Sequence, residues 1–401
     1  MPAATPIPRG PSVLTLYSAE DLLTGPGCPV CRYADEASDR FLGWFAVEGH
    51  ADPGTITSLC DSLGMCARHT RRLMSQPGAA NRMTAVYRYV VTAARGRMTG
   101  RPSRPAPCPA CRHDDAAAGR ALDTLLEGLA DSGVMHRFRE LGALCLPHAG
   151  ASAAAGKRQT MTLLAETTRS AITAPGSGAD WLAGSDRDAE TRAVLRRALP
   201  VPGSSVPSVC PPCLAGAQAE RDALGRLPRP PGDEPDAALV LCATHLADAA
   251  TAAGGSASLR ALLAWQERCL TARLRSGPSH WLPASQRRRD PAADCSVCRA
   301  RQDAAGRVLV TLCRATEPSR AAAVCVRHHL IARMTDPRAG KALATAAVGR
   351  ADELITQLAE AFDRTARARS QGARAAESGV WRNAAAFLDG AVFGGCPPRL
   401  P

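Results

Sequence analysis

Aromatic side chains are scarce in this chain: phenylalanine, tyrosine and tryptophan make up only 4% of its 401 residues. Lysine is almost absent, because only Lys157 and Lys341 occur among the 49 basic residues. With so few large apolar side chains, each domain can bury only a thin hydrophobic core. Small modules with thin cores commonly need a bound metal or a cross-link for stability.

Long apolar segments are also missing. No run of about 18 apolar residues occurs, so no membrane-spanning helix is predicted. Residues 1–12 are rich in proline and lack the apolar centre of a secretory signal. We therefore expect a cytoplasmic protein with no membrane partner, in a compartment where disulfides are disfavoured.

The usual signatures of catalysis are absent from the sequence. We find no Walker loop, no dinucleotide-binding glycine fingerprint, no His-Glu-x-x-His and no Gly-x-Ser-x-Gly. No spaced pair of acidic residues suggests general acid–base catalysis. An enzymatic function is therefore not predicted.

Cysteine, by contrast, is abundant and regularly placed. Four Cys-x-x-Cys phrases alternate strictly with four Cys-x-x-His phrases, where chance would give less than about one of each. Twelve of the sixteen cysteines and four of the nine histidines are used in this way. The candidate ligands are Cys28, Cys31, Cys66, His69, Cys108, Cys111, Cys145, His148, Cys210, Cys213, Cys242, His245, Cys295, Cys298, Cys325 and His328.

Three cysteines and one histidine are a typical ligand set for a structural zinc ion. We expect each Cys-x-x-Cys to share one ion with the Cys-x-x-His that follows it, with 26 to 34 residues between the two. Four Zn²⁺ ions are thus predicted, each with a closed ligand set and no open position for substrate. Two alternatives stay open: iron–sulfur clusters, which more often use four cysteines, and redox-active Cys-x-x-Cys pairs.

Proline follows the first cysteine in three of the four Cys-x-x-Cys phrases. Proline is favoured at the first position of a helix, so Cys28, Cys108 and Cys210 are predicted at helix starts. The positive end of the helix dipole would favour thiolates there.

The repeats predict an all-α fold built as a tandem array of four helical modules, each held by one Cys3His site. The expected boundaries are a flexible tail (1–18), module one (19–100), module two (101–200), module three (201–286) and module four (287–401) with a final helix. A segment rich in Gly, Pro and Ser, 174–209, is the predicted hinge.

A smaller repeat accompanies the ligands. Trp181, Trp281 and Trp381 each follow the closing helix of a module, and we expect them to pack back onto a helical core. The other four cysteines fall outside the pattern, and we expect them to be small buried apolar residues; they are Cys60, Cys269, Cys313 and Cys396. His329, beside His328, is an alternative ligand.

The formal charge is +12, and residues 287–401 contribute much of it, with 19 basic against 11 acidic side chains. These arginines alternate with acids and alanines, which is typical of a solvated helical face. Nucleic-acid binding through the last module is kept as an alternative.

Module one resembles an uncharacterised bacterial family of helical proteins. The resemblance lies in Cys28-Pro-Val-Cys31, in Gly64-Met-Cys66-Ala-Arg-His69 and in Asn81-Arg82, and it returns at Phe362-Asp363 and Val380-Trp381-Arg382. It implies Cys3His zinc sites in an all-helical fold, and it implies no activity. The Asn-Arg pair is missing from modules two to four.

These patterns predict a zinc-binding, non-enzymatic scaffold or regulatory interaction protein whose partner is another protein. A nucleic-acid-binding zinc protein is the first alternative. The second is a zinc- or redox-responsive switch, with module four as its candidate sensor because serine replaces proline there.

Overall fold

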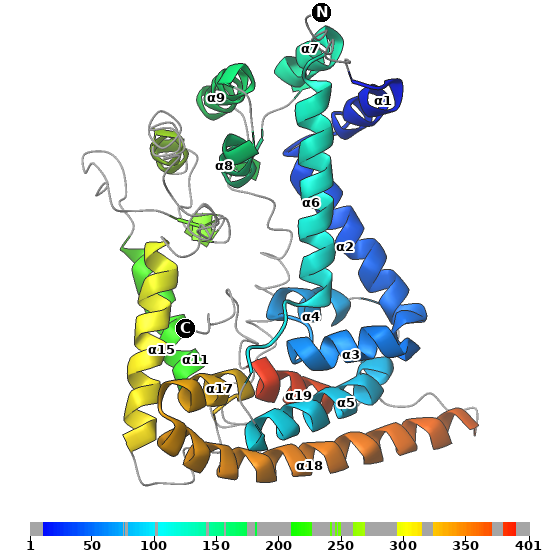
Figure 1. Ribbon diagram of the computed structural model, residues 1–401, viewed down its shortest axis with the longest axis vertical. Coiled ribbons are helices and arrows are strands. Elements are labelled where there is room, and N and C mark those ends of the chain that lie inside the picture. Colours follow the sequence, from blue (N-terminus) through cyan, green and yellow to red (C-terminus); the bar gives the residue numbers. More distant parts are fainter. Residues whose placement is uncertain are drawn as a thin grey trace, which may run out of the picture. The chain divides into compact units, whose positions relative to one another are not determined.

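A computed structural model gives the fold of the chain, and it is helical throughout the residues that it describes (Figure 1). The described residues are 11–74, 76, 79–100, 103–141, 144–155, 158–174, 181–182, 210–226, 241–242, 245–246, 248–249, 260–268, 295–314, 324–370 and 380–389. The predicted all-α class is confirmed for them. Within these ranges, no helix is both long and apolar enough to cross a membrane.

The chain divides into two compact units, each made of three separate stretches. Unit 1 comprises residues 1–37, 114–186 and 227–295, and unit 2 comprises residues 38–113, 187–226 and 296–401. The boundary falls inside two long helices, α2 (Pro29–Val47) and α6 (Pro109–Gly128).

Unit 1 contains α1 (Val13–Leu22), α7 (Ser132–Leu141), α8 (Leu146–Ala155) and α9 (Arg158–Thr173). Helix α1 begins inside the segment predicted as a flexible tail, and the Ser12 hydroxyl caps it by accepting a hydrogen bond from the Thr15 amide. Its inner face packs onto a core that includes Ala19, Leu125 and Phe138. Most of the predicted hinge 174–209 lies outside the described residues.

Unit 2 contains the larger core. Its helices are α3 (Pro53–Ser62), α4 (Ala67–Met74), α5 (Ala79–Thr99), α11 (Pro211–Gly225), α15 (Ser296–Arg314), α17 (Val326–Thr335), α18 (Pro337–Ser370) and α19 (Val380–Asp389), with a short 3-10 turn, η1 (Gly49–Ala51).

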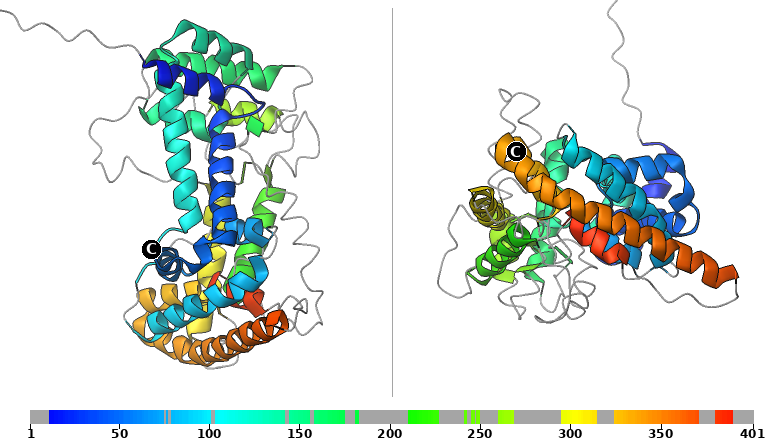
Figure 2. Two further views of the ribbon diagram at one scale, coloured as in Figure 1. Left: turned by 90° about the vertical axis from the view of Figure 1, so that its right-hand side faces the viewer. Right: turned by 90° about the horizontal axis from the view of Figure 1, so that it is seen from below.

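Helix α5 lies along α18, with α19 packed against both (Figures 1 and 2). One face of α5 is apolar and buried: Met83, Val86 and Val90 are each at most 1% exposed. They share one core with Leu354 and Leu358 of α18, more than 250 positions further along the chain. Two segments that are far apart in the sequence, α5 and α18, are therefore joined by packing within this unit.

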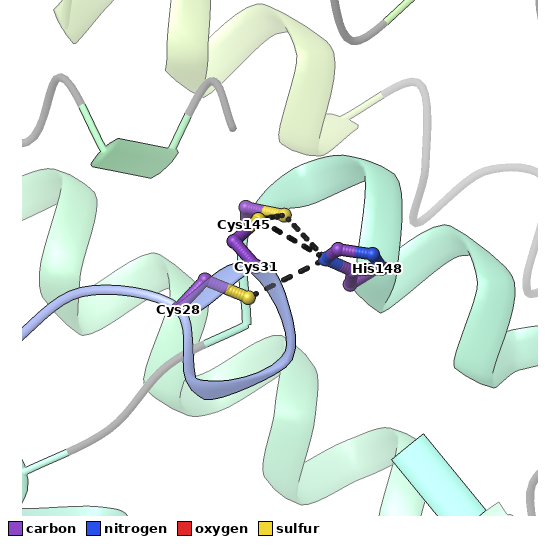
Figure 3. A group of neighbouring side chains, drawn as sticks. All are labelled: Cys28, Cys31, Cys145 and His148. Atoms are coloured by element: carbon purple, nitrogen blue, oxygen red, sulfur yellow. Dashed lines mark hydrogen bonds between the residues drawn. The ribbon is translucent and has the colours of Figure 1, made fainter. Parts of the chain in front are cut away.

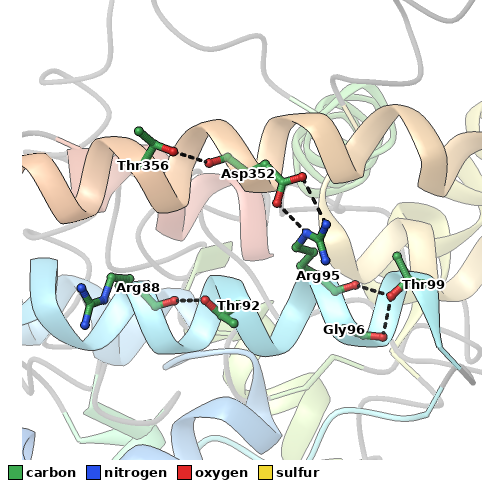
Figure 4. Close-up of polar contacts among 7 residues, drawn as sticks. All are labelled: Arg88, Thr92, Arg95, Gly96, Thr99, Asp352 and Thr356. Atoms are coloured by element: carbon green, nitrogen blue, oxygen red, sulfur yellow. Dashed lines mark hydrogen bonds and ion pairs between the residues drawn. The ribbon is translucent and has the colours of Figure 1, made fainter.

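Polar contacts on the surface of the same helix pair are shown in Figure 4. The guanidinium of Arg95 on α5 donates to both carboxylate oxygens of Asp352 on α18. Because both side chains are about half exposed, the ion pair contributes less than about 1 kcal/mol. Burial of the apolar stripe holds these helices together.

Helices α11 and α15 form a second close pair in unit 2. A buried ion pair joins them, with Arg301 Nη1 3.1 Å from Glu220 Oε2. Gly216 allows the close approach, because a side chain there would stand 3.1 Å from Cγ of Arg301.

Two of the three repeated tryptophans pack as expected. Trp381 is 2% exposed, and its ring centroid lies 6.3 Å from that of Tyr87 on α5. Trp181 packs against the core of unit 1, close to Gly27. Trp281 lies outside the described residues.

Two glycines of α18 provide a matched test of packing. At Gly340 an added Cβ would lie 2.5 Å from the backbone of Arg333 on α17, whereas Gly349 faces open space. We expect Gly340→Ala to destabilise the protein by about 1–3 kcal/mol, because the α17–α18 turn must open. Gly349→Ala should instead stabilise it by about 0.5–1 kcal/mol. Denaturant unfolding of both variants checks the opposite signs.

Candidate metal centres

All sixteen predicted ligands are described, and they come together in four groups of three cysteines and one histidine. In each group the ligand atoms all lie within 4.8 Å of one another. We name the groups A (Cys28, Cys31, Cys145, His148), B (Cys66, His69, Cys108, Cys111), C (Cys210, Cys213, Cys325, His328) and D (Cys242, His245, Cys295, Cys298).

The predicted pairing of the phrases is wrong. We expected Cys28 and Cys31 to join Cys66 and His69 within one module, but no group combines a Cys-x-x-Cys with the next Cys-x-x-His. In the first half of the chain, the first phrase joins the fourth in group A, and the second joins the third in group B. The second half repeats this nesting, with group C enclosing group D. Each site therefore unites two predicted modules.

Helix lengths give the physical reason for the nested pairing. Helix α2 has 19 residues and carries the chain about 28 Å away from Cys28 and Cys31. Helix α3 has only 10 residues, about 15 Å, and cannot bring the chain back. The next phrase, Cys66 to His69, instead meets the Cys-x-x-Cys at the start of α6 in group B.

Group A shows how the four ligands face one point (Figure 3). Nδ1 of His148 lies 3.1 Å from Sγ of Cys145, 3.3 Å from Sγ of Cys31 and 3.5 Å from Sγ of Cys28. The Sγ atoms of Cys31 and Cys145 are 3.6 Å apart. These atoms occupy the corners of a compact tetrahedron that one metal ion could fill.

Groups B and C have the same geometry. Nδ1 of His69 lies 3.3 to 3.7 Å from the three sulfurs of group B, and Nδ1 of His328 lies 3.2 to 3.5 Å from those of group C. In group D, Nδ1 of His245 is 3.3 Å from both Cys242 and Cys295. Each histidine thus presents the same ring nitrogen to its site.

The first cysteine of each described phrase precedes a helical turn. Helices α2, α6 and α11 begin at the prolines that follow Cys28, Cys108 and Cys210, as predicted. In seven of the phrases, the carbonyl of the first cysteine accepts a hydrogen bond from the amide of the residue four positions later, which is the first hydrogen bond of a helix. They begin at Cys28, Cys66, Cys108, Cys145, Cys210, Cys242 and Cys325. Helix N-termini favour thiolates, which is the form that a metal needs.

Within the groups the cysteine thiols differ in how readily they lose their protons. Hydrogen bonds from Cys111 and Cys66 lower the pKa of the Cys108 thiol to about 3, while burial, together with the neighbouring thiols Cys28 and Cys31, raises the pKa of Cys145. Burial alone would lower the pKa of His148. Hydrogen bonds and charge from Cys28 and Cys31 outweigh this effect and raise the pKa to about 10. An arriving cation would displace the remaining protons, so metal affinity should fall at acidic pH.

A turn that contains Gly64 positions Cys66 in group B. Helix α3 ends in a left-handed turn, with Leu63 at φ 58° and Gly64 at φ 90°. The Gly64 amide donates to the carbonyl of Leu59, 2.7 Å away, which closes the helix end. A positive φ is natural for glycine, which explains this residue two positions before the ligand.

Arg327 links the surroundings of two groups within unit 2. It precedes the group C ligand His328, is 9% exposed and donates to the carbonyl of Ser62 at the end of α3, four residues before Cys66. A cation at a helix C-terminus is favourable. The elements that carry groups B and C therefore support each other.

The remaining cysteines and histidines stand apart from the four groups. Cys60 and Cys313 are half-buried and belong to no metal group among the described residues, while Cys269 and Cys396 lie outside those residues. His329, the alternative ligand, is fully buried but is not part of group C.

Comparison of the chain with protein-family models, with curated proteins and with solved structures gave no match. The arguments on function therefore rest on the residues of this chain.

Proposed function

We propose that each group holds one zinc ion, four in all, with all sixteen cysteine and histidine ligands in use. The spacing of the ligand atoms carries the proposal. Zinc with Zn–S bonds of about 2.3 Å and Zn–N bonds of about 2.0–2.1 Å places two sulfurs ~3.8 Å apart and sulfur and nitrogen ~3.5 Å apart. The sulfur–sulfur distances of 3.6, 3.6 and 3.8 Å in groups A, B and C fit this geometry.

The same spacing argues against iron–sulfur clusters. In a cluster the four protein ligands are divided between two or more iron atoms, so ligands on different irons stand further apart than they do around a single ion, whereas all four ligand atoms of each group lie within 4.8 Å of one another. A pair of catalytic thiols would not need a histidine in every group. A single tetrahedral ion accounts for the ligand count, the ligand type and the distances together.

We further propose that the protein is a non-enzymatic scaffold or regulatory interaction protein of the cytoplasm. Each group already supplies four ligands, whereas catalytic zinc keeps a position for water. The ions would join helix starts that are 39 to 120 residues apart in the sequence, which is a structural task. A protein partner is favoured, because several arginines near the C-terminus are used internally: Arg350 pairs with Glu353, and Arg364 pairs with Glu360.

Nucleic-acid binding is the alternative that the basic composition favours. Binding through phosphate contacts would weaken steeply with salt. A gel-shift series at rising salt, with and without bound metal, separates this function from the first one.

The zinc proposal predicts the outcome of native mass spectrometry. We expect the purified chain to carry four zinc ions, no iron and no nucleic acid, and to lose helical circular dichroism when a strong chelator removes the metal. Structural zinc commonly contributes about 10–16 kcal/mol to folding. Zinc added back should restore the signal, and magnesium is the matched control that should not. Iron in place of zinc, or a metal-free folded chain, contradicts the proposal.

A further inference from the structure

The four groups differ in how well solvent reaches their ligands. In group A, Cys31 and His148 are partly exposed, whereas all four ligands of group C are buried. Group C joins the first and fourth motifs of the second half of the chain, just as group A joins the first and fourth motifs of the first half. The two groups thus share ligand type and topology, and they differ in access.

The partly exposed cysteine of group A, Cys31, has a second sulfur within reach. Sγ of Cys145 lies 3.6 Å from Sγ of Cys31, and Cys145 itself is fully buried. A disulfide needs the sulfurs at about 2.05 Å, so an approach of roughly 1.5 Å would join them. Oxidation of cysteine follows thiolate character and exposure, and sensor cysteines commonly lie beside a second, resolving cysteine.

We infer that Cys31 is the site at which peroxides oxidise this protein, with Cys145 as the resolving thiol. This inference rests on the proposed zinc occupancy of group A. The Cys31 thiolate attacks one peroxide oxygen: an S–O bond forms, the O–O bond breaks, and the departing hydroxide takes a proton to become water. Cys31 is then a sulfenic acid.

The Cys145 thiolate next attacks the Cys31 sulfur. The S–S bond forms, the S–O bond breaks, and hydroxide leaves. The two thiolates have lost two electrons, and the peroxide has gained them. Only Cys28 and His148 remain as ligands in group A, which is too few to hold the ion, so zinc is released. The disulfide still ties the start of α2 to the start of α8, and the core of unit 1 therefore keeps its cross-link.

Group B should follow group A, because Cys111 is partly exposed and lies 3.6 Å from Cys66. Group C should be the slowest of these three, since the sulfurs of Cys213 and Cys325 are 3.8 Å apart and both residues are buried. The sensor assigned by geometry is thus the first site of the chain, and not the one in the last predicted module.

The test uses the full zinc-loaded chain and hydrogen peroxide. Zinc release is followed with a chromogenic chelator, and disulfides are mapped by differential alkylation and mass spectrometry. We expect one zinc equivalent to leave at least about tenfold faster than the others, together with a Cys31–Cys145 disulfide. Release of all four ions at one rate, or a first disulfide in another group or between Cys28 and Cys31, overturns the inference.

Two variants distinguish the loss of a reactive thiol from the loss of a folded metal site. Cys31→His keeps four ligands in group A, because Cys2His2 sets also hold structural zinc, yet it removes the partly exposed thiol. It should abolish the fast phase while four ions stay bound. The matched Cys213→His in group C should leave the fast phase unchanged. A fast phase that persists in Cys31→His refutes the inference, whereas a wild-type chain purified without zinc refutes the proposed function itself.

Discussion

Alanine at all four positions of group A will leave a chain that holds three zinc ions. Alanine at Cys28, Cys31, Cys66 and His69 will leave only two, because it removes half of group A and half of group B. Two remaining ligands are too few for a structural site, so each damaged group loses its ion. Native mass spectrometry with metal analysis gives the counts.

The two variants are matched in composition, because each removes three cysteines and one histidine. If the ligands paired within each predicted module, the counts would be reversed: two ions in the first variant and three in the second. The second variant should also be the less stable of the two, since each structural zinc is worth about 10 kcal/mol or more. Equal counts in the two variants would contradict both pairings.

Truncation of Trp381 should produce the largest loss of stability from a single apolar side chain. Trp381 is 2% exposed, and α19 packs through it onto α5, near Tyr87. Trp381→Ala leaves a cavity in the main core of unit 2, and we expect a loss of about 3–5 kcal/mol. Thermal or denaturant unfolding of the zinc-loaded protein measures it.

Trp44→Ala is the control for this prediction. Trp44 has the same side chain but is 42% exposed, so its loss should cost less than half as much. Equal losses in the two variants would mean that α19 does not depend on Trp381 for its position.

Local features of the site could be predicted from the sequence because they depend on short spacings. A gap of two residues lets both ligands of a phrase reach one ion from a single helical turn, whatever the rest of the chain does. The proline after Cys28, Cys108 and Cys210 indicates a helix start in the same local way. These predictions required no knowledge of the tertiary fold.

The pairing of the phrases could not be read from spacing alone, because it depends on where each helix takes the chain. A signal was nevertheless present. The helical stretch after Cys31 is about twice as long as the helix that follows it, as α2 and α3 show. Comparing the expected helix lengths would have argued against a return to Cys28.

The packing of α5 against α18 and α19 could not be predicted from the sequence either. Helix α5 has an apolar stripe at helical spacing, and periodicity cannot say which partner covers such a stripe. Its partners are α18 and α19. The segments that carry the resemblance to the bacterial family, near Asn81-Arg82 and near Trp381, therefore lie on helices of one unit.

The nested pairing has a consequence for the order in which the protein can be made. The sulfurs of Cys31 and Cys145 are 114 positions apart, so a ribosome working at roughly 5–20 residues per second needs about 6–23 s between the two. During that interval Cys28 and Cys31 have no partner ligands, while group B, whose ligands span 39 to 45 positions, can already close. A fragment cut at a predicted module boundary, such as residues 19–100, contains no complete site and should be unable to keep zinc.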